Sequence, residues 1–134
     1  MKYFSEKELR IENAPERVKQ NMKLLVEEVL DPLREKVGKI KVSSGYRDPV
    51  YNAREGGSPT SDHITGCATD IVPLESDIDD VFALLIREFK YNQVILEKKN
   101  TRWIHISYKK EGNKQEAKTA IVNPKTNKAT YKNV

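Results

Sequence analysis

The chain has only two histidines, His63 and His105, and both lie in segments with further potential ligands for a metal ion. Asp70 follows His63 by seven residues, with Gly66 between them. A catalytic zinc ion takes three protein ligands of the histidine and carboxylate type and keeps a fourth position for water. Two histidines and one aspartate would complete that set if the fold brings His105 close to the other two residues.

The seven-residue spacing indicates that a loop, rather than a helix, supports His63 and Asp70. In a zincin the two histidines lie on one face of a helix in a His-Glu-x-x-His pattern, which this chain lacks. Each residue also has an ordinary structural explanation. A histidine on an alternating strand commonly packs within the fold, and an aspartate after a glycine turn commonly caps backbone groups. Spacing alone leaves both interpretations open.

Three blocks of sequence occur in a characteristic order. They are Ser44-Gly45-Tyr46-Arg47, the pattern Ser-x-His-x-x-Gly-x-Ala-x-Asp over residues 61–70, and Trp103-x-His105. Together they resemble the zinc D-alanyl-D-alanine carboxypeptidase family, which has the hedgehog/DD-peptidase fold and includes phage endolysins and vancomycin-resistance dipeptidases. The resemblance spans about residues 3–108, and the middle block is the most specific of the three.

The resemblance implies that His63, Asp70 and His105 bind zinc and that Arg47 binds a carboxylate of the substrate. A guanidinium group suits this role because it stays charged at every working pH and matches a carboxylate with two parallel hydrogen bonds. Arg47 could instead form a structural ion pair with one of the many acidic side chains. The substrate that the resemblance implies is a peptide of bacterial peptidoglycan.

Two hydroxyl side chains in the same blocks, those of Ser61 and Tyr46, are further candidates. They could orient the metal ligands or the substrate. The alternative is that they only satisfy backbone groups, as hydroxyls in turns commonly do.

The chain departs from the family pattern at the position of the general base. Many members carry an acidic residue three positions before the final histidine, where this chain has Arg102. Hydrolysis still needs a group that accepts and returns a proton. We predict that Glu97 takes this role, because a hairpin that pairs Glu97 with Trp103 would put the Glu97 side chain on the face of His105.

The prediction for Glu97 depends on the register of the hairpin. A slip of one residue would turn the Glu97 side chain to the opposite face, and the acids Asp62 or Glu55 would then be the candidates. Glu97 could also be a surface acid that balances Lys98 and Lys99.

Cys67 is the only cysteine, so the chain cannot form an internal disulfide, which fits synthesis in a reducing compartment. Its place within the metal motif favours a small buried side chain over a catalytic nucleophile. We therefore reject a cysteine-protease mechanism as long as zinc is bound.

The elements that must position these residues begin with helices. A capping-box pattern predicts a short helix over residues 5–11. A second helix is expected to start after Pro15, bend at Pro32 and end at Gly38, and Ser76 is expected to cap a third. Helical spacing in the second helix predicts a core stripe that consists of Val18, Met22, Leu25, Val26, Val29, Leu30 and Leu33.

Alternating apolar residues predict strands over residues 39–44, 92–97 and 102–108, with a hairpin between the last two. Residues 46–70 lack periodicity and are too many for a plain connector, so they are expected to form a functional loop. Helices first and an antiparallel hairpin later predict an α+β fold, with helices packed on one side of a small antiparallel sheet.

At 134 residues, 37% of them hydrophobic, the chain is expected to form one domain over residues 1–134. The positive charge is concentrated in residues 109–134, which contain seven lysines and two glutamates. This basic segment has two weaker strand candidates, Lys118–Val122 and Lys128–Tyr131, which would form a terminal hairpin. Arginine and aromatic residues do not cluster there, so we expect no nucleic-acid partner.

No stretch is apolar enough to span a membrane, and the first residues lack the apolar region of a signal peptide. We therefore expect a protein that does not insert into a membrane, stays cytoplasmic and acts on the cell wall after release. We also expect a monomer. The expected function is zinc-dependent hydrolysis of a peptidoglycan peptide bond in phage or prophage lysis, of the D-Ala-D-Ala carboxypeptidase or L-Ala-D-Glu endopeptidase type. The alternative is a catalytically silent zinc-containing binding domain of the hedgehog type.

Overall fold

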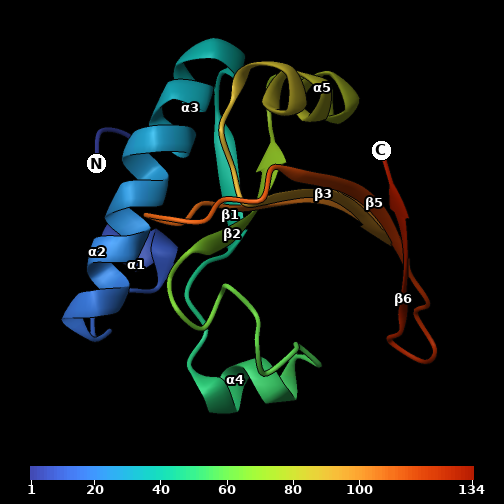
Figure 1. Cartoon of the computed structure of the whole chain (residues 1–134), viewed down its shortest axis with the longest axis horizontal. Coiled ribbons are helices and arrows are strands. Elements are labelled where there is room, and N and C mark those ends of the chain that lie inside the picture. Colours follow the sequence, from blue (N-terminus) through green and yellow to red (C-terminus); the bar gives the residue numbers. More distant parts are fainter.

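The computed structural model describes residues 1–134 and shows a curved six-stranded sheet accompanied by helices (Figure 1). The strand order is β1-β2-β4-β3-β5-β6, and all neighbouring strands are antiparallel except β3 and β5, which are parallel. This arrangement confirms the predicted α+β class. The strands are β1 (Ile40–Ser44), β2 (Ala68–Pro73), β3 (Gln93–Lys99), β4 (Thr101–Ser107), β5 (Glu116–Val122) and β6 (Ala129–Asn133).

The long helix predicted after Pro15 is formed by three segments that follow one another without a break and run as one column in Figure 1. Pro32, near the start of the last segment, has no amide hydrogen to donate to the preceding turn. A wider π-helical turn lies directly before it. The helices are α1 (Glu6–Leu9), α2 (Glu16–Leu25), the π-helical η1 (Val26–Leu30), α3 (Asp31–Val37), α4 (Pro49–Arg54) and α5 (Ile78–Glu88).

The core lies between this helical column, α5 and one face of the sheet. Every residue predicted for the core stripe is fully buried, and the stripe belongs to one cluster with Ile71 of β2 and Ile104 of β4. Side chains alternate across a strand, so the neighbouring residues Asp70 and His105 point to the opposite face. The apolar face of the sheet therefore holds the core, and the other face is left for polar side chains.

Two elements were not predicted, the strand β2 and the helix α4. The strand β2 is buried over most of its length, so its sequence does not alternate between apolar and polar residues. The helix α4 starts where Asp48 accepts a hydrogen bond from the amide of Tyr51, and Pro49 occupies the first helical position. Figure 1 shows α4 apart from the other helices.

The expected cap of α5 was wrong by one residue. Asp77 accepts hydrogen bonds from the amides of Asp79 and Asp80 and so caps the helix. The hydroxyl of Ser76 instead donates to the carbonyl oxygen of Val37, which ties the start of α5 to the end of α3. A carboxylate competes well for this position because it offers a charge to the helix N-terminus.

The basic C-terminal segment forms the antiparallel hairpin β5–β6. Residues 108–115 carry the chain from the end of β4 past β3 to its free edge. Because β5 then starts beside the start of β3, the two strands run parallel. This pair is the one departure from the predicted antiparallel sheet.

Candidate metal centre

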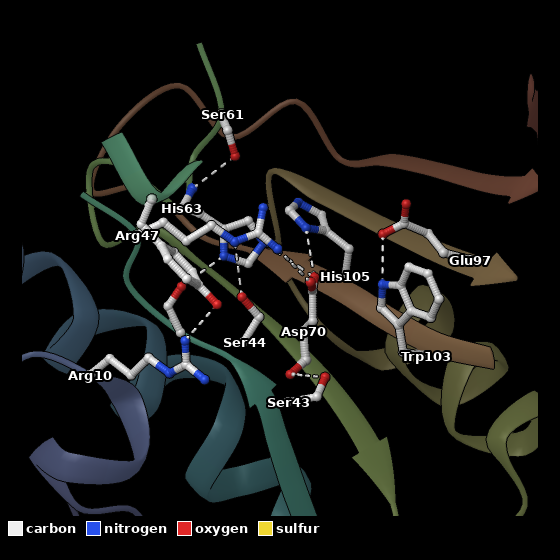
Figure 2. Close-up of polar contacts among 12 residues, drawn as sticks. Arg10, Ser43, Ser44, Arg47, Ser61, His63, Asp70, Glu97, Trp103 and His105 are labelled. Atoms are coloured by element: carbon white, nitrogen blue, oxygen red, sulfur yellow. Dashed lines mark hydrogen bonds and ion pairs between the residues drawn. The ribbon is translucent and has the colours of Figure 1, made fainter. Parts of the chain in front are cut away.

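Two strands and one turn-rich segment bring His63, Asp70 and His105 together (Figure 2). Asp70 of β2 lies opposite His105 of β4 in the antiparallel register. Oδ1 of Asp70 lies 3.2 Å from Nε2 of His63 and 3.2 Å from Nδ1 of His105. One possible ligand atom from each residue lies within 4.8 Å of the others. The three side chains can thus share one metal ion.

The segment that carries His63 is shaped by close backbone packing. Gly66 has a φ of 79°, and a Cβ atom there would press on the backbone of Val18 in α2. Ser61 Oγ accepts a hydrogen bond of 3.2 Å from the backbone amide of His63. The sequence thus needs a glycine at this turn, and Ser61 holds the histidine's backbone.

A hydrogen bond to the backbone determines the tautomer of His63. Its Nδ1 lies 2.9 Å from the carbonyl oxygen of Gly45, which can only accept, so Nδ1 carries the hydrogen. In the neutral ring Nε2 then has only a lone pair, and this lone pair faces the Asp70 carboxylate. Such a contact is favourable when a cation lies between the two atoms. Metal-binding histidines commonly donate their other ring N–H to a carbonyl in this way, so the donor set fits a metal ion.

The charges of the site are strongly coupled. Burial by itself would raise the pKa of Asp70, but its contacts with the rings of His105 and His63 hold that pKa far below its ordinary value. Burial by itself would lower the pKa of His105, but the hydrogen bond with Asp70 and the negative charges of Asp70 and Glu97 raise it. Asp70 is therefore ionised at neutral pH and available as a ligand.

Arg47 reaches this site from the segment after β1 (Figure 2). Its Nη2 lies 3.4 Å from Oδ2 of Asp70, and its Nε donates a hydrogen bond of 3.0 Å to Ser44 Oγ. The structure therefore contains the ion pair that the sequence left open. Arg47 also lines the cleft above the site and has further N–H groups for a substrate carboxylate.

Of the two predicted hydroxyl residues, Ser61 and Tyr46, only one lies in the cleft. Ser61 lines the same cleft as His63 and Arg47. Tyr46 is not among the residues that line it. The side chain of Tyr46 packs against the core, and its amide donates to the carbonyl oxygen of Leu9.

Glu97 lies in the cleft on the same face as His105. The predicted register is confirmed, because Glu97 pairs with Trp103 in the β3–β4 hairpin. Oε2 of Glu97 accepts a hydrogen bond of 3.0 Å from the indole Nε1 of Trp103 (Figure 2). Burial and the charge of Asp70 raise the pKa of Glu97, against the opposing effects of His105 and Trp103.

The alternative proton acceptors, Asp62 and Glu55, also line the cleft. Asp62 accepts a hydrogen bond from Asn92 and pairs with Lys109, so its carboxylate is engaged at the far end of β3. Arg102, which stands where many family members have an acid, faces the helices and pairs with Asp79 of α5 at 2.8 Å.

Cys67 is buried, and burial raises the pKa of its thiol, which disfavours the reactive thiolate. This finding agrees with the rejection of a cysteine nucleophile.

Sequence reasoning gave no role to several residues that shape the site. The carbonyl of Gly45 and the indole of Trp103 orient His63 and Glu97, although the sequence marked them only as parts of motifs. Asn127 and Tyr131 of the C-terminal hairpin line the cleft. The signals for the hairpin were the two strand candidates Lys118–Val122 and Lys128–Tyr131, and they say nothing about what the hairpin faces.

The site opens into a polar cleft with a volume of about 680 Å³. The cleft holds two histidines, one aspartate and a further carboxylate close by. This composition is typical of the catalytic metal centre of a hydrolase. The sequence model of the family Peptidase M15 matches residues 2–107, and the chain belongs to this family. Peptidases of this family depend on zinc.

No curated protein matches the chain. None of its helices combines the length and the apolar character that crossing a membrane requires.

Proposed function

We propose that this protein hydrolyses a peptide bond of bacterial peptidoglycan with a zinc ion bound by His63, Asp70 and His105. The convergence of these three side chains, in a member of Peptidase M15, is the observation that carries the proposal. When bound, zinc supplies a Lewis acid that polarises a carbonyl group and makes water nucleophilic at neutral pH.

Glu97 is the proposed general base. Its carboxylate lines the cleft and is held by the indole of Trp103. It accepts the proton of the attacking water and returns it to the leaving amine. The raised pKa suits this double role, because a carboxyl group whose pKa lies nearer to the working pH is better able to donate the proton again.

Arg47 is the proposed anchor of the substrate. Its guanidinium group lines the cleft beside Asp70 and matches a carboxylate with parallel hydrogen bonds. If Arg47 binds the carboxylate at the end of the peptide, the protein is a D-Ala-D-Ala carboxypeptidase. If it binds the carboxylate of a D-Glu residue, the protein is an L-Ala-D-Glu endopeptidase. Ser61 supports the site by holding the backbone of His63.

A role in phage or prophage lysis is proposed because the three sequence blocks resemble those of phage endolysins. The proposed ligands and the proposed base all come from one chain, which supports activity as a monomer.

The test uses purified peptidoglycan and mass spectrometry of the released fragments. We expect about one zinc ion per chain, release of peptide fragments, loss of release with a chelator and recovery with added zinc. The masses identify the bond that is cut. A protein that holds zinc and releases no fragments would overturn the proposed hydrolysis.

A catalytically silent zinc domain that binds cell-wall polymer is the second candidate. The replacement of the common acid by Arg102, which faces α5, favours it. This candidate predicts that the protein sediments with insoluble peptidoglycan and leaves it intact, whereas the peptidase predicts soluble fragments under the same conditions.

A further inference from the structure

The hairpin β5–β6 lies outside the residues matched by Peptidase M15, yet it forms part of the cleft. β5 pairs with β3 from Gln93 to Lys98, and the sheet curves at β5 and β6 (Figure 1). The hairpin residues that line the cleft are Val122, Asn127, Ala129 and Tyr131, besides Glu116 at the start of β5. A part of the chain beyond the family match therefore contributes to the site.

The register places Tyr131 on the same row of the sheet as Glu97, with one small residue between them. Glu97 pairs with Ala120, and Ala120 pairs with Tyr131. Neighbouring strands lie about 4.8 Å apart, so the backbones of Glu97 and Tyr131 are separated by about 10 Å. Ala120 between them is 2% exposed, so neighbouring side chains cover it. Burial and the charge of Glu97 raise the pKa of Tyr131, which agrees with this proximity.

The turn of the hairpin meets the opposite wall of the cleft. The side chain of Asn127 fills the space beside Gly56, where a Cβ atom would overlap its amide nitrogen. Oδ1 of Asn127 also accepts a hydrogen bond of 2.7 Å from Nζ of Lys99, at the end of β3. The loop after α4 and the hairpin turn thus touch each other at the Lys99 end of the cleft.

The ring of Tyr131 is available for contact with a ligand. It is 54% exposed, although it lines a cleft. Nζ of Lys118 lies 5.9 Å from the centre of the ring and supports it from β5. Tyrosine offers a large apolar surface with few rotatable bonds, and for this reason it is frequent among residues that determine binding.

We propose that Tyr131 is a specificity-determining residue whose ring contacts the part of a peptide substrate that extends from the cleaved bond along the cleft past Glu97. Glu97 and Tyr131 line the same cleft, so an extended peptide that passes Glu97 reaches the exposed ring of Tyr131. The contact between Asn127 and Gly56 bounds the cleft at this end. The inference rests on the proposed peptidase function and names the residue that selects long peptides over short ones.

The test compares Tyr131→Ala with Tyr131→Phe and with Ile121→Ala. Ile121 belongs to the same hairpin, is 64% exposed and points to the other face of the sheet, so Ile121→Ala is the matched control. The substrates are the complete stem peptide of peptidoglycan and the shortest fragment of it that the unaltered protein cleaves.

For the stem peptide we expect Tyr131→Ala to raise KM about tenfold with kcat nearly unchanged. The KM of the short fragment stays the same, Tyr131→Phe keeps most of the affinity, and Ile121→Ala changes neither substrate. Equal changes for both substrates, an unchanged KM for the stem peptide, or the same loss in Ile121→Ala would overturn the proposal.

Binding to a variant without turnover separates this proposal from the proposed hydrolysis. Calorimetric titration of the stem peptide into Glu97→Gln, with and without Tyr131→Ala, should show affinity about tenfold weaker in the double variant. This difference would stand even if the unaltered protein cleaves nothing. Equal affinities in the two variants would remove Tyr131 from substrate recognition.

Discussion

Replacing Glu97 by glutamine tests the proposed mechanism at its most specific point. Glutamine has nearly the same shape as glutamate, and its amide oxygen can still accept the hydrogen bond from the Trp103 indole. The substitution therefore removes the negative charge and the proton-accepting ability while the packing of the β3–β4 hairpin is kept. Any change in turnover then reports on proton transfer.

The expected loss follows from the contribution of general acid–base groups. Such groups accelerate reactions by about 10²- to 10⁴-fold. At about 1.36 kcal/mol for each factor of ten, the loss corresponds to about 3–5 kcal/mol of transition-state stabilisation. Zinc binding should persist, because Glu97 is not one of the three converging ligands. The charge of Glu97 raises the pKa of His105, so its removal also makes protonation compete less with the metal.

The assay measures kcat and KM on a stem peptide together with the zinc content of each variant. Glu111→Gln serves as the matched control, because Glu111 is an exposed acid outside the cleft. We expect full zinc content in both variants and loss of kcat only in Glu97→Gln. A Glu97→Gln protein that keeps zinc and turns over within about threefold of the unaltered rate would refute the role of Glu97 as general base.

Two further substitutions test the surroundings of the site. In Trp103→Phe, Glu97 loses the hydrogen bond that lowers its pKa, while burial still raises that pKa. Because a base works only when deprotonated, the acid limb of the pH profile of kcat/KM should move to higher pH. An unmoved acid limb would contradict the role of the Trp103 indole. In Gly45→Ala, the new Cβ atom overlaps the carbonyl of Leu9 and displaces the carbonyl that binds His63. We expect urea denaturation to show a loss of about 1–3 kcal/mol, together with a lower zinc content. Gly112→Ala, where a Cβ atom meets nothing although φ is 75°, controls for the backbone cost of an alanine without a steric overlap. It should leave the zinc content unchanged, and an equal loss of zinc there would contradict the steric argument.

The helical column and the β3–β4 hairpin could be predicted because their signals are local. Seven apolar residues recur at the period of a helix, and each of them is buried. The hairpin could be predicted to pair Glu97 with Trp103 because the alternation of side chains along a strand leaves few possible registers. These features depend on neighbours a few positions away in the chain.

The strand β2 and the cap of α5 could not be predicted in the same way. β2 is central and buried, so the two-residue period that identifies half-buried strands is absent. Ser76 and Asp77 are both good caps by residue type, and the contact of Ser76 with Val37, distant in sequence, decides between them. The parallel pairing of β5 with β3 likewise depends on the path of residues 108–115 over the sheet.

The sequence by itself determined which side chains could form the site, because the types and spacing of His63, Asp70 and His105 are written in short motifs. Only the tertiary structure decided that Arg47 pairs with Asp70, that Tyr46 lies outside the cleft and that Tyr131 lies inside it. The physical reason is that a motif specifies backbone geometry over a few residues, whereas neighbours across a cleft are determined by how the whole chain buries its apolar surface.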